Sequence, residues 1–221
     1  MASETVENYL KQICLEQQRR GGNELVPMGV VAEAVGVTPG TATTMIKSLA
    51  DSRLVRYEPR AGVELTKAGR RLAHRVVHRH RLVEQLLVEV LGMDWSEVHD
   101  EAEQLEHAIS DKVLQKIDAL LGHPETDPHG SPIPREGQPL PADDFEALAL
   151  AEVGQRRRLA RIVNHDPGFL RFLEQHGLVP GAEVDILQRS PDGDAWTVQA
   201  RPHESVTLGA AGASRMLFAV E

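Results

Sequence analysis

Two histidines and two glutamates lie close together near the middle of this 221-residue chain and could bind a metal ion. His99, Glu103, Glu106 and His107 occupy positions i, i+4, i+7 and i+8, which an uninterrupted α-helix presents on one face. Nitrogen and oxygen donors together suit a divalent transition metal. A solvated acidic helix face is the simpler interpretation of this segment alone, so the rest of the chain must decide. Apolar residues at helical spacing show that the segment also packs: Val98, Ala102, Leu105 and Ile109.

Length and composition limit the class of protein. A chain of 221 residues can form one large domain or two to three small ones. No apolar run reaches the length of a membrane span, so we expect no membrane partner. The single cysteine, Cys14, excludes an internal disulfide and agrees with a cytoplasmic location.

Charge is spread unevenly along the chain, whose net charge is −9. Residues 1–75 carry 11 Lys and Arg against 8 Asp and Glu, whereas the remaining residues are strongly acidic. Because phosphate contacts depend on the local patch, the N-terminal third can bind nucleic acid despite the acidic total. The low aromatic content, 4%, argues against single-strand binding by base stacking.

The first 66 residues are predicted to form a winged helix-turn-helix domain. Apolar spacing and capping residues predict helices over residues 3–20, 28–35 and 38–51, followed by short strands at 54–57 and 63–65. The third helix presents short hydroxyl side chains and one lysine, which suits entry into the major groove of double-stranded DNA. A winged helix used for protein contacts is the alternative. The predicted DNA-binding residues are Thr38, Pro39, Gly40, Thr41, Thr44 and Lys47, with Arg56 and Arg60 of the wing on phosphates.

Two long helices are predicted next, over residues 67–91 and 96–121, and they define a helical dimerisation and metal-binding domain at 67–122. A homodimer would match a palindromic operator. A Pro-rich linker follows at 123–146. From residue 147 the pattern changes to short strands at 159–163, 183–188, 196–200, 206–208 and 217–220, interrupted by a helix at 168–176, which predicts a small β-barrel over 147–221. The fold class is therefore mainly α with a small all-β C-terminal domain.

Together these parts resemble the diphtheria-toxin-repressor family of metal-dependent transcriptional repressors, especially its manganese-responsive branch. The resemblance covers nearly the whole chain. Its most specific stretch is residues 98–111, supported by residues 6–10, 78–84 and 127–134. Residues 177–184 are similar to the SH3-like module of ferrous-transport accessory proteins, so the C-terminal barrel is expected to be SH3-like, of the FeoA type.

The resemblance implies a first metal site that joins the first helix to the helix predicted at 96–121. Carried over by position, its ligands are Asn8, Glu103, Glu106 and His107. Iron-responsive members have cysteine where Glu103 stands, and carboxylate favours Mn²⁺ or Fe²⁺ over softer ions. Asn8 departs from the usual Met or Asp and is a neutral, weak ligand. Lys11 stands where sensors with paired manganese ions have glutamate, and its ammonium would repel a metal.

The resemblance also implies a second site, between the dimerisation helix and the C-terminal module. His80 and Glu84 are at i and i+4 of one helix and can bind one ion. His99 is assigned to this second site. The full candidate set is His80, Glu84, His99, Asp127, His129 and Asp166.

The sequence therefore predicts a metal-dependent DNA-binding repressor that senses Mn²⁺, or alternatively Fe²⁺, controls metal-ion homeostasis genes and has no enzymatic activity. We expect bound metal to clamp the first helix and set the two DNA-reading heads at the operator spacing. The alternatives are an iron-responsive regulator of the same family, a constitutive winged-helix DNA binder whose acidic face contacts a protein, and a helical metalloenzyme. The last lacks the paired Glu-x-x-His helices of di-metal carboxylate bundles.

Overall fold

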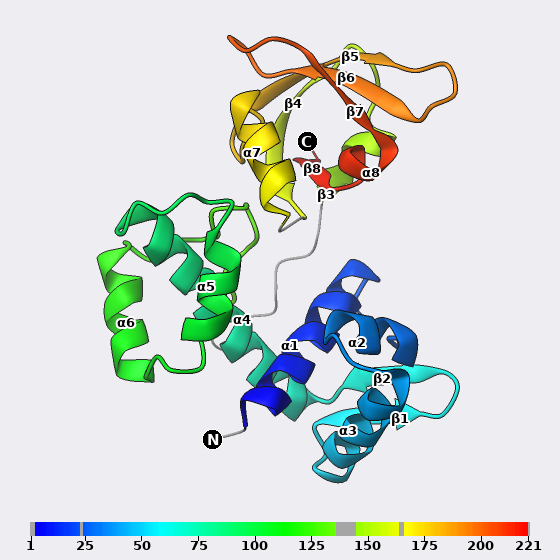
Figure 1. The fold of residues 1–221 in the computed structure, drawn as a ribbon, viewed down its shortest axis with the longest axis vertical. Helices are drawn as coiled ribbons and strands as arrows, with labels where there is room; N and C mark the ends of the chain where they lie inside the picture. Colours follow the sequence, from blue (N-terminus) through cyan, green and yellow to red (C-terminus); the bar gives the residue numbers. More distant parts are fainter. Residues whose placement is uncertain (1–2, 23, 136–144, 164–165, 221) are drawn as a thin grey trace. The chain divides into compact units, whose positions relative to one another are not determined.

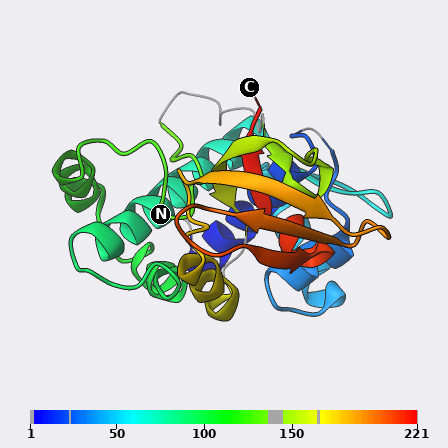
Figure 2. The same ribbon diagram turned by 90° about the horizontal axis from the view of Figure 1, so that it is seen from above.

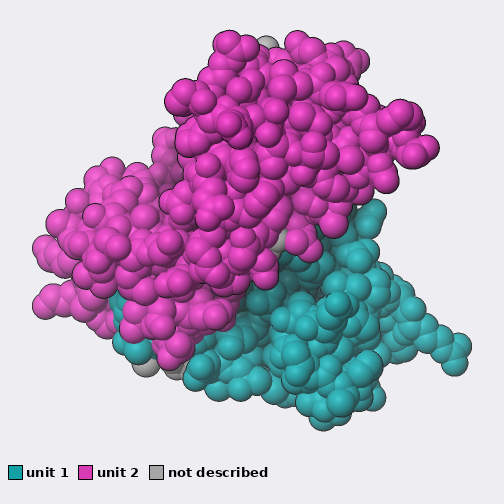
Figure 3. Space-filling view, turned by 45° about the horizontal axis from the view of Figure 1, so that its top comes forward, with its two compact units in different colours: residues 1–80, 106–109, 134–143 teal, residues 81–105, 110–133, 144–221 magenta. Residues whose placement is uncertain are grey.

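The computed structural model describes residues 3–22, 24–135, 145–163 and 166–220, so residues 136–144 of the predicted linker lie outside the described part. The chain divides into two compact units, which Figure 3 shows in teal and magenta, and Figure 1 labels the helices and strands. Unit 1 comprises residues 1–80, 106–109 and 134–143, and unit 2 comprises residues 81–105, 110–133 and 144–221. Helix α4 (Lys67–Glu89) contributes to both. Among the described residues no helix is long and apolar enough to cross a membrane.

Unit 1 contains the predicted winged helix-turn-helix. Helix α1 (Glu4–Arg19) begins after Ser3, whose hydroxyl accepts a hydrogen bond from the amide of Val6. Helices α2 (Met28–Ala34) and α3 (Pro39–Asp51) follow, and Thr38 caps α3 as expected from Thr-Pro. The wing consists of antiparallel strands β1 (Val55–Glu58) and β2 (Gly62–Leu65).

The apolar sides of these elements form one core. Side chains from α1, α2, α3 and the wing meet in it, and α1 contacts α2 and strand β2. Gln17 of α1 adds a polar link, because its amide oxygen accepts a hydrogen bond from the backbone of Leu65 in the wing. The most deeply buried members are Leu10, Ile13, Val26, Ala42, Ile46 and Val63.

The prediction of one continuous helix over 96–121 is wrong. The structure has two helices there, α5 (Val98–Leu105) and α6 (Asp111–Leu120). Ser110 provides the physical reason, since its side chain caps α6 by accepting a hydrogen bond from Val113 and so starts a new helix. Glu106 and His107 therefore lie in the turn that follows α5. Helix α4 also ends earlier than predicted, at Glu89.

Unit 2 contains a six-stranded antiparallel sheet in the order β3-β8-β4-β5-β6-β7. Figure 2 shows its strands side by side in the yellow-to-red part of the chain. Strand β3 (Phe145–Ala147) was missed by the sequence prediction, because three residues carry too little alternation to be recognised. The five predicted strands are present as β4 (Arg156–Ile162), β5 (Glu183–Arg189), β6 (Ala195–Gln199), β7 (Val206–Gly209) and β8 (Met216–Ala219).

Short helices complete this domain. Helix α7 (Pro167–Gln175) matches the predicted helix at 168–176, and a 3₁₀ turn η1 (Leu148–Leu150) and a short helix α8 (Ala210–Ala213) flank the sheet. Leu170 and Leu173 of α7 are buried in the same core as the inner faces of the strands. Trp95, from the segment before α5, belongs to this core too. The helical part of unit 2 and its sheet thus share one packed interior.

Candidate metal centre

Three side chains with metal-binding atoms converge in unit 2. Glu84 comes from α4, and Asp127 and His129 come from the loop that follows α6. One potential ligand atom from each lies within 4.8 Å of the others, and all three residues are buried. We call Glu84, Asp127 and His129 the metal-candidate cluster.

The orientation of His129 favours a cation in this cluster. Its Nε2 atom lies 3.0 Å from the carbonyl oxygen of Trp95, and since a carbonyl can only accept, Nε2 carries the hydrogen. Nδ1 is then the nitrogen that can offer a lone pair to a metal ion, and it lies 3.9 Å from Oε2 of Glu84. A metal ion between these two atoms would bind both, and the backbone contact of the other nitrogen is typical of ligating histidines.

The two carboxylates of the cluster disfavour each other's charge. Burial raises the pKa of Asp127, and the nearby charge of Glu84 raises it further. Arg81 opposes this only in part, with its Nε atom 3.5 Å from Oδ2 of Asp127. A divalent cation would relieve the remaining repulsion. Two carboxylates and one imidazole are donors that Mn²⁺ and Fe²⁺ accept, so the residues present fit a metal ion.

The loop that carries Asp127 and His129 is held in place by its own backbone and by the sheet. Oδ1 of Asp127 accepts hydrogen bonds from the backbone amides of His129 and Ser131, both at 2.9 Å. The carbonyl oxygen of His129 accepts from the amide of Ile162 in β4 at 2.9 Å. Gly130 has a φ of +84°, and a Cβ there would lie 2.0 Å from the carbonyl oxygen of Ala160. Only glycine lets the loop approach β4 this closely.

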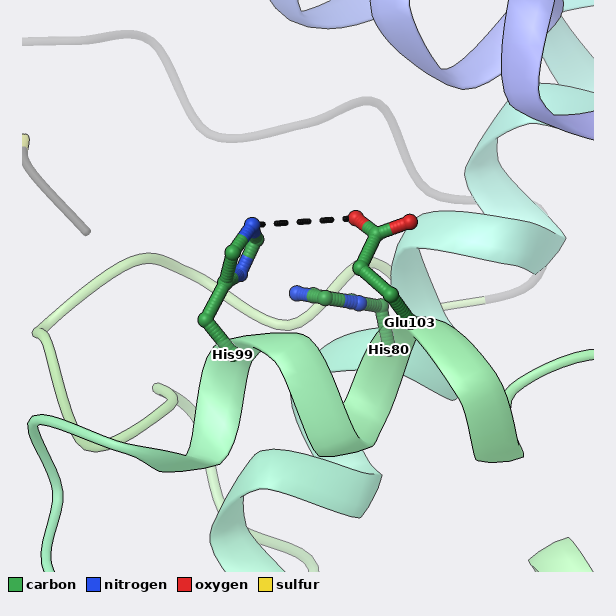
Figure 4. Close-up of side chains that lie close together, drawn as sticks. All are labelled: His80, His99 and Glu103. Carbon is green, nitrogen blue, oxygen red and sulfur yellow. Dashed lines mark ion pairs between the residues drawn. The ribbon is translucent and has the colours of Figure 1, made fainter.

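His99 lies beside the metal-candidate cluster. Its Nδ1 atom is 3.2 Å from Oε1 of Glu84, and its Nε2 atom is 3.7 Å from Oε1 of Glu103. Figure 4 shows the pair formed by His99 and Glu103 and also labels His80 of α4. The structure thus places Glu103 with His99, a residue predicted for the second site. Asp166, also predicted for the second site, is exposed and caps α7 by accepting a hydrogen bond from Phe169 at 2.7 Å.

The rest of the predicted first site lies in unit 1 and is occupied by protein contacts. The Nζ atom of Lys11 donates a hydrogen bond to Oε1 of Glu106 at 2.7 Å, and both side chains are buried. His107 has Nδ1 2.8 Å from Oε2 of Glu7 and Nε2 2.8 Å from Oδ1 of Asn8. We call Glu7, Asn8, Lys11, Glu106 and His107 the helix-docking cluster, since it joins α1 to the turn after α5.

Lys11 and His80 together contact both carboxylate oxygens of Glu106 and stabilise its negative charge. Burial by itself would raise the pKa of Glu106, but the hydrogen bond from His80 and the charge of Lys11 outweigh it, so the pKa lies below its ordinary value. Nδ1 of His80 is 2.6 Å from Oε2 of Glu106, so both carboxylate oxygens are engaged. A metal ion at this place would have to share Glu106 with a buried ammonium. Paired in this way, Glu106 and His107 do not favour a metal ion, and the ligand roles predicted for the first site stay predictions.

Lys11 was predicted from the sequence to be unfavourable to a metal, but its pairing with Glu106 was not predicted. Lys11 follows Glu7 and Asn8 by one helical turn, so all three lie on the face of α1 that contacts the turn after α5. That spacing was the signal for the ion pair. The contact between His129 and the Trp95 carbonyl could not be predicted from the sequence, because it joins a side chain to a backbone oxygen 34 positions away.

The predicted DNA-reading residues lie on the outer side of unit 1. The α3 residues Thr38, Pro39, Gly40, Thr41, Thr44 and Lys47 are all exposed. The Thr44 hydroxyl donates to the carbonyl of Gly40 at 3.1 Å, so its oxygen can still accept from a base or phosphate. In the wing, Arg60 is exposed, whereas Arg56 is paired with Glu64 at 2.8 Å. The Arg56 side chain is 62% exposed and a guanidinium carries five donors, so this pairing leaves donors that can contact a phosphate.

Comparisons with known proteins agree with this architecture. Residues 1–63 match the N-terminal DNA-binding domain of the iron dependent repressor family, and residues 66–135 match its metal binding and dimerisation domain. Residues 147–219 match the FeoA domain. The chain is 33% identical to the iron-dependent repressor IdeR of Mycobacterium tuberculosis over 217 residues, which cover 93% of this chain and 92% of that protein. It is 32% identical to the diphtheria toxin repressor of Corynebacterium glutamicum, covering 83% and 84%.

Solved structures give the same result. A manganese-dependent transcriptional repressor in complex with manganese superposes with a TM-score of 0.89 at 36% identity, covering 98% of this chain and all of the other. The manganese regulator SloR superposes with a TM-score of 0.78 at 31% identity, covering 98% of each chain. The chain belongs to the diphtheria-toxin-repressor family of metal-dependent, DNA-binding transcriptional repressors, a family with a dimerisation domain. This membership excludes the metalloenzyme alternative.

Proposed function

We propose that this chain is a manganese-responsive repressor that acts in the cytoplasm as a homodimer on palindromic operator DNA and controls metal-ion homeostasis genes. The metal-candidate cluster carries the proposal, since its ligand atoms converge within 4.8 Å in a buried place. Its donors, two carboxylates and one imidazole without a thiolate, favour Mn²⁺. Fe²⁺ is the alternative, because IdeR is named for iron.

The physical role of the metal follows from the repulsion that it removes. Without metal, Glu84 and Asp127 disfavour each other, which loosens the loop at residues 126–132 and its attachment to β4. With metal, one ion joins α4 to the loop, and the loop is hydrogen-bonded to β4 of the sheet. Bound metal favours DNA binding only if the DNA-competent form binds it more tightly than the other form does. By reciprocity, operator DNA then increases the affinity for metal by the same factor.

A DNA-binding titration tests this proposal. Duplexes selected from a random library with purified protein and Mn²⁺ serve as the operator, and fluorescence anisotropy measures affinity with Mn²⁺, with anaerobic Fe²⁺ and with a chelator. We expect the affinity to fall at least tenfold in the chelator and to rise more with Mn²⁺ than with Fe²⁺. Equal affinity in all three solutions would refute metal control and leave a constitutive DNA binder.

Matched histidine substitutions locate the regulatory metal. His129→Gln removes the imidazole of the metal-candidate cluster and should abolish the response to Mn²⁺. His123→Gln is the control, since His123 is largely exposed and contacts Asp118 at 2.8 Å. It should respond like the wild type. An unchanged response in His129→Gln would place the regulatory metal elsewhere.

A further inference from the structure

Side-chain contacts attach helix α1 to the turn after α5. Three contacts span about a hundred positions of sequence: Lys11 with Glu106 at 2.7 Å, His107 with Glu7 at 2.8 Å and His107 with Asn8 at 2.8 Å. All belong to unit 1. Arg79 of α4 adds a weaker contact, with its Nη1 atom 3.8 Å from Oε1 of Glu7.

The Lys11 ammonium lies where a metal would have to bind to perform this attachment. Its side chain is 2% exposed and that of Glu106 is 0% exposed, so water does not screen the pair. A metal bound to Glu106 would lie beside the ammonium or would force it out of a buried position. The first arrangement places two positive charges together in a buried place, and the second gives up the buried ion pair, so both are unfavourable. Both ring nitrogens of His107 are also engaged by oxygens of α1.

We propose that Lys11 is a resident cation that holds helix α1 on Glu106 in place of a metal ion, so that metal regulates this chain through the metal-candidate cluster and not through Glu106. The claim about where metal regulates the chain rests on the proposed function, whereas the claim about Lys11 and Glu106 does not. The DNA-reading unit is then docked on its own α1 contacts at any metal concentration, and metal acts on the loop attached to the sheet.

Paired titrations test where metal binds. Free Mn²⁺ is followed by its electron paramagnetic resonance signal while it is added to the full chain and to two variants with the same substitution, His129→Gln and His107→Gln. We expect His129→Gln to lose the tight Mn²⁺ binding of the wild type and His107→Gln to retain it. Loss of Mn²⁺ binding in His107→Gln, with native circular dichroism, would overturn the proposal.

A gain of binding provides a second test. Lys11→Glu replaces the resident cation by a carboxylate next to Glu106, so two acids then face each other there. This variant should bind additional Mn²⁺ per chain relative to the wild type, and Asp127→Ala should not remove the added binding. If Lys11→Glu binds no more Mn²⁺ than the wild type, Lys11 does not stand in the place of a metal.

Amide hydrogen exchange in a chelator tests the docking role without any metal. The α1 amides of the wild type should be protected, and those of Lys11→Met should exchange at least tenfold faster, while the α7 amides change little. If Lys11→Met is too unstable to measure, the double variant Lys11→Met with Glu106→Gln removes both charges and should show the same loss at α1. Equal α1 protection with and without Lys11 would refute the resident cation. A wild type that binds no Mn²⁺ would refute the proposed function. The α1 exchange rates with and without Lys11 would still decide whether Lys11 is the resident cation.

Discussion

The helix-docking cluster and the metal-candidate cluster contain similar side chains but balance their charges differently. In the first, the ammonium of Lys11 and the ring of His80 contact both oxygens of Glu106, and the pKa of that acid is lowered. In the second, two buried acids face one histidine, and the pKa of Asp127 is raised despite the nearby guanidinium of Arg81. A cluster of acids and histidines therefore favours a metal ion only where the cations that the protein supplies leave the acids incompletely balanced.

The largest effect that would sharpen this comparison is expected from Lys11→Met. Removal of one partner from a buried ion pair leaves the other charge uncompensated and costs about 3–5 kcal/mol. Urea unfolding followed by circular dichroism measures this loss in the free energy of unfolding. Lys11→Met combined with Glu106→Gln removes both charges and should recover much of it. A single variant as stable as the wild type would show that the pair contributes nothing.

Metal removal at the other cluster should have the next largest effect. Metal that binds only the folded chain stabilises it by about 2.7 kcal/mol at roughly 100 times its dissociation constant. Mn²⁺ should therefore raise the Tm of the wild type, and Asp127→Ala should abolish that rise. Glu106→Gln should keep it, although this variant starts from a lower stability. If Glu106→Gln and Asp127→Ala both lose the Mn²⁺-dependent rise in Tm to the same extent, the two clusters do not differ in metal binding.

Gly130 allows a test of the loop without change of a ligand. Gly130→Ala would combine left-handed backbone strain with a Cβ 2.0 Å from a backbone oxygen of β4. The loop must move, so we expect a stability loss on the order of 1–3 kcal/mol and weaker Mn²⁺ binding by calorimetry. Gly154→Ala is the matched control, since Gly154 has a φ of +89° and nothing within 4 Å of the added Cβ. It should lose some stability and retain Mn²⁺ affinity, and equal Mn²⁺ affinities in the two variants would show that the loop position is irrelevant.

The two acids should respond to pH in opposite directions. The lowered pKa of Glu106 means that its contribution to stability is present above the ordinary glutamate range and is lost as pH falls through the lowered value. The raised pKa of Asp127 means that its contribution is present below the ordinary aspartate range and is lost as pH rises through the raised value. Unfolding of metal-free wild type, Glu106→Gln and Asp127→Asn across pH measures both.

Mn²⁺ affinity should follow the second of these titrations. A carboxylate must lose its proton before it binds metal, so the affinity should rise as pH rises through the raised pKa of Asp127. Calorimetry at a series of pH values checks this direction. An affinity that does not change with pH would exclude Asp127 as a ligand that titrates on binding.

Most helices and strands could be predicted because their signals are local. Ser3 and Thr38 mark the starts of α1 and α3, and period-two alternation marks the five longer strands of the sheet. The break between α5 and α6 was missed, because apolar spacing continued through residues 98–109 while the capping role of Ser110 was overlooked. The four-part division at residues 66, 122 and 146 stays a prediction.

The candidate site could be predicted only in part, because residue types and helical spacing do not give orientation. Glu84, Asp127 and His129 were named from the resemblance, and the structure brings them together. The separation of Glu103 from Glu106 and His107 follows from the end of α5 at Leu105, which turns the later residues toward α1. The ligand role of each predicted residue stays a prediction, including that of Asp166, which the structure shows as a helix cap.

The Lys11–Glu106 pair would also determine how steeply DNA binding responds to the metal concentration. An intramolecular ammonium is present at constant occupancy, so under the resident-cation proposal the docking of α1 would not vary with the supply of free metal. Each subunit of a dimer would then respond through the ion at its metal-candidate cluster. The Hill coefficient cannot exceed the number of binding sites, which sets a ceiling of about two for a dimer. The chain would thus report metal as a graded signal, because one of the two places that could have added cooperativity is permanently filled.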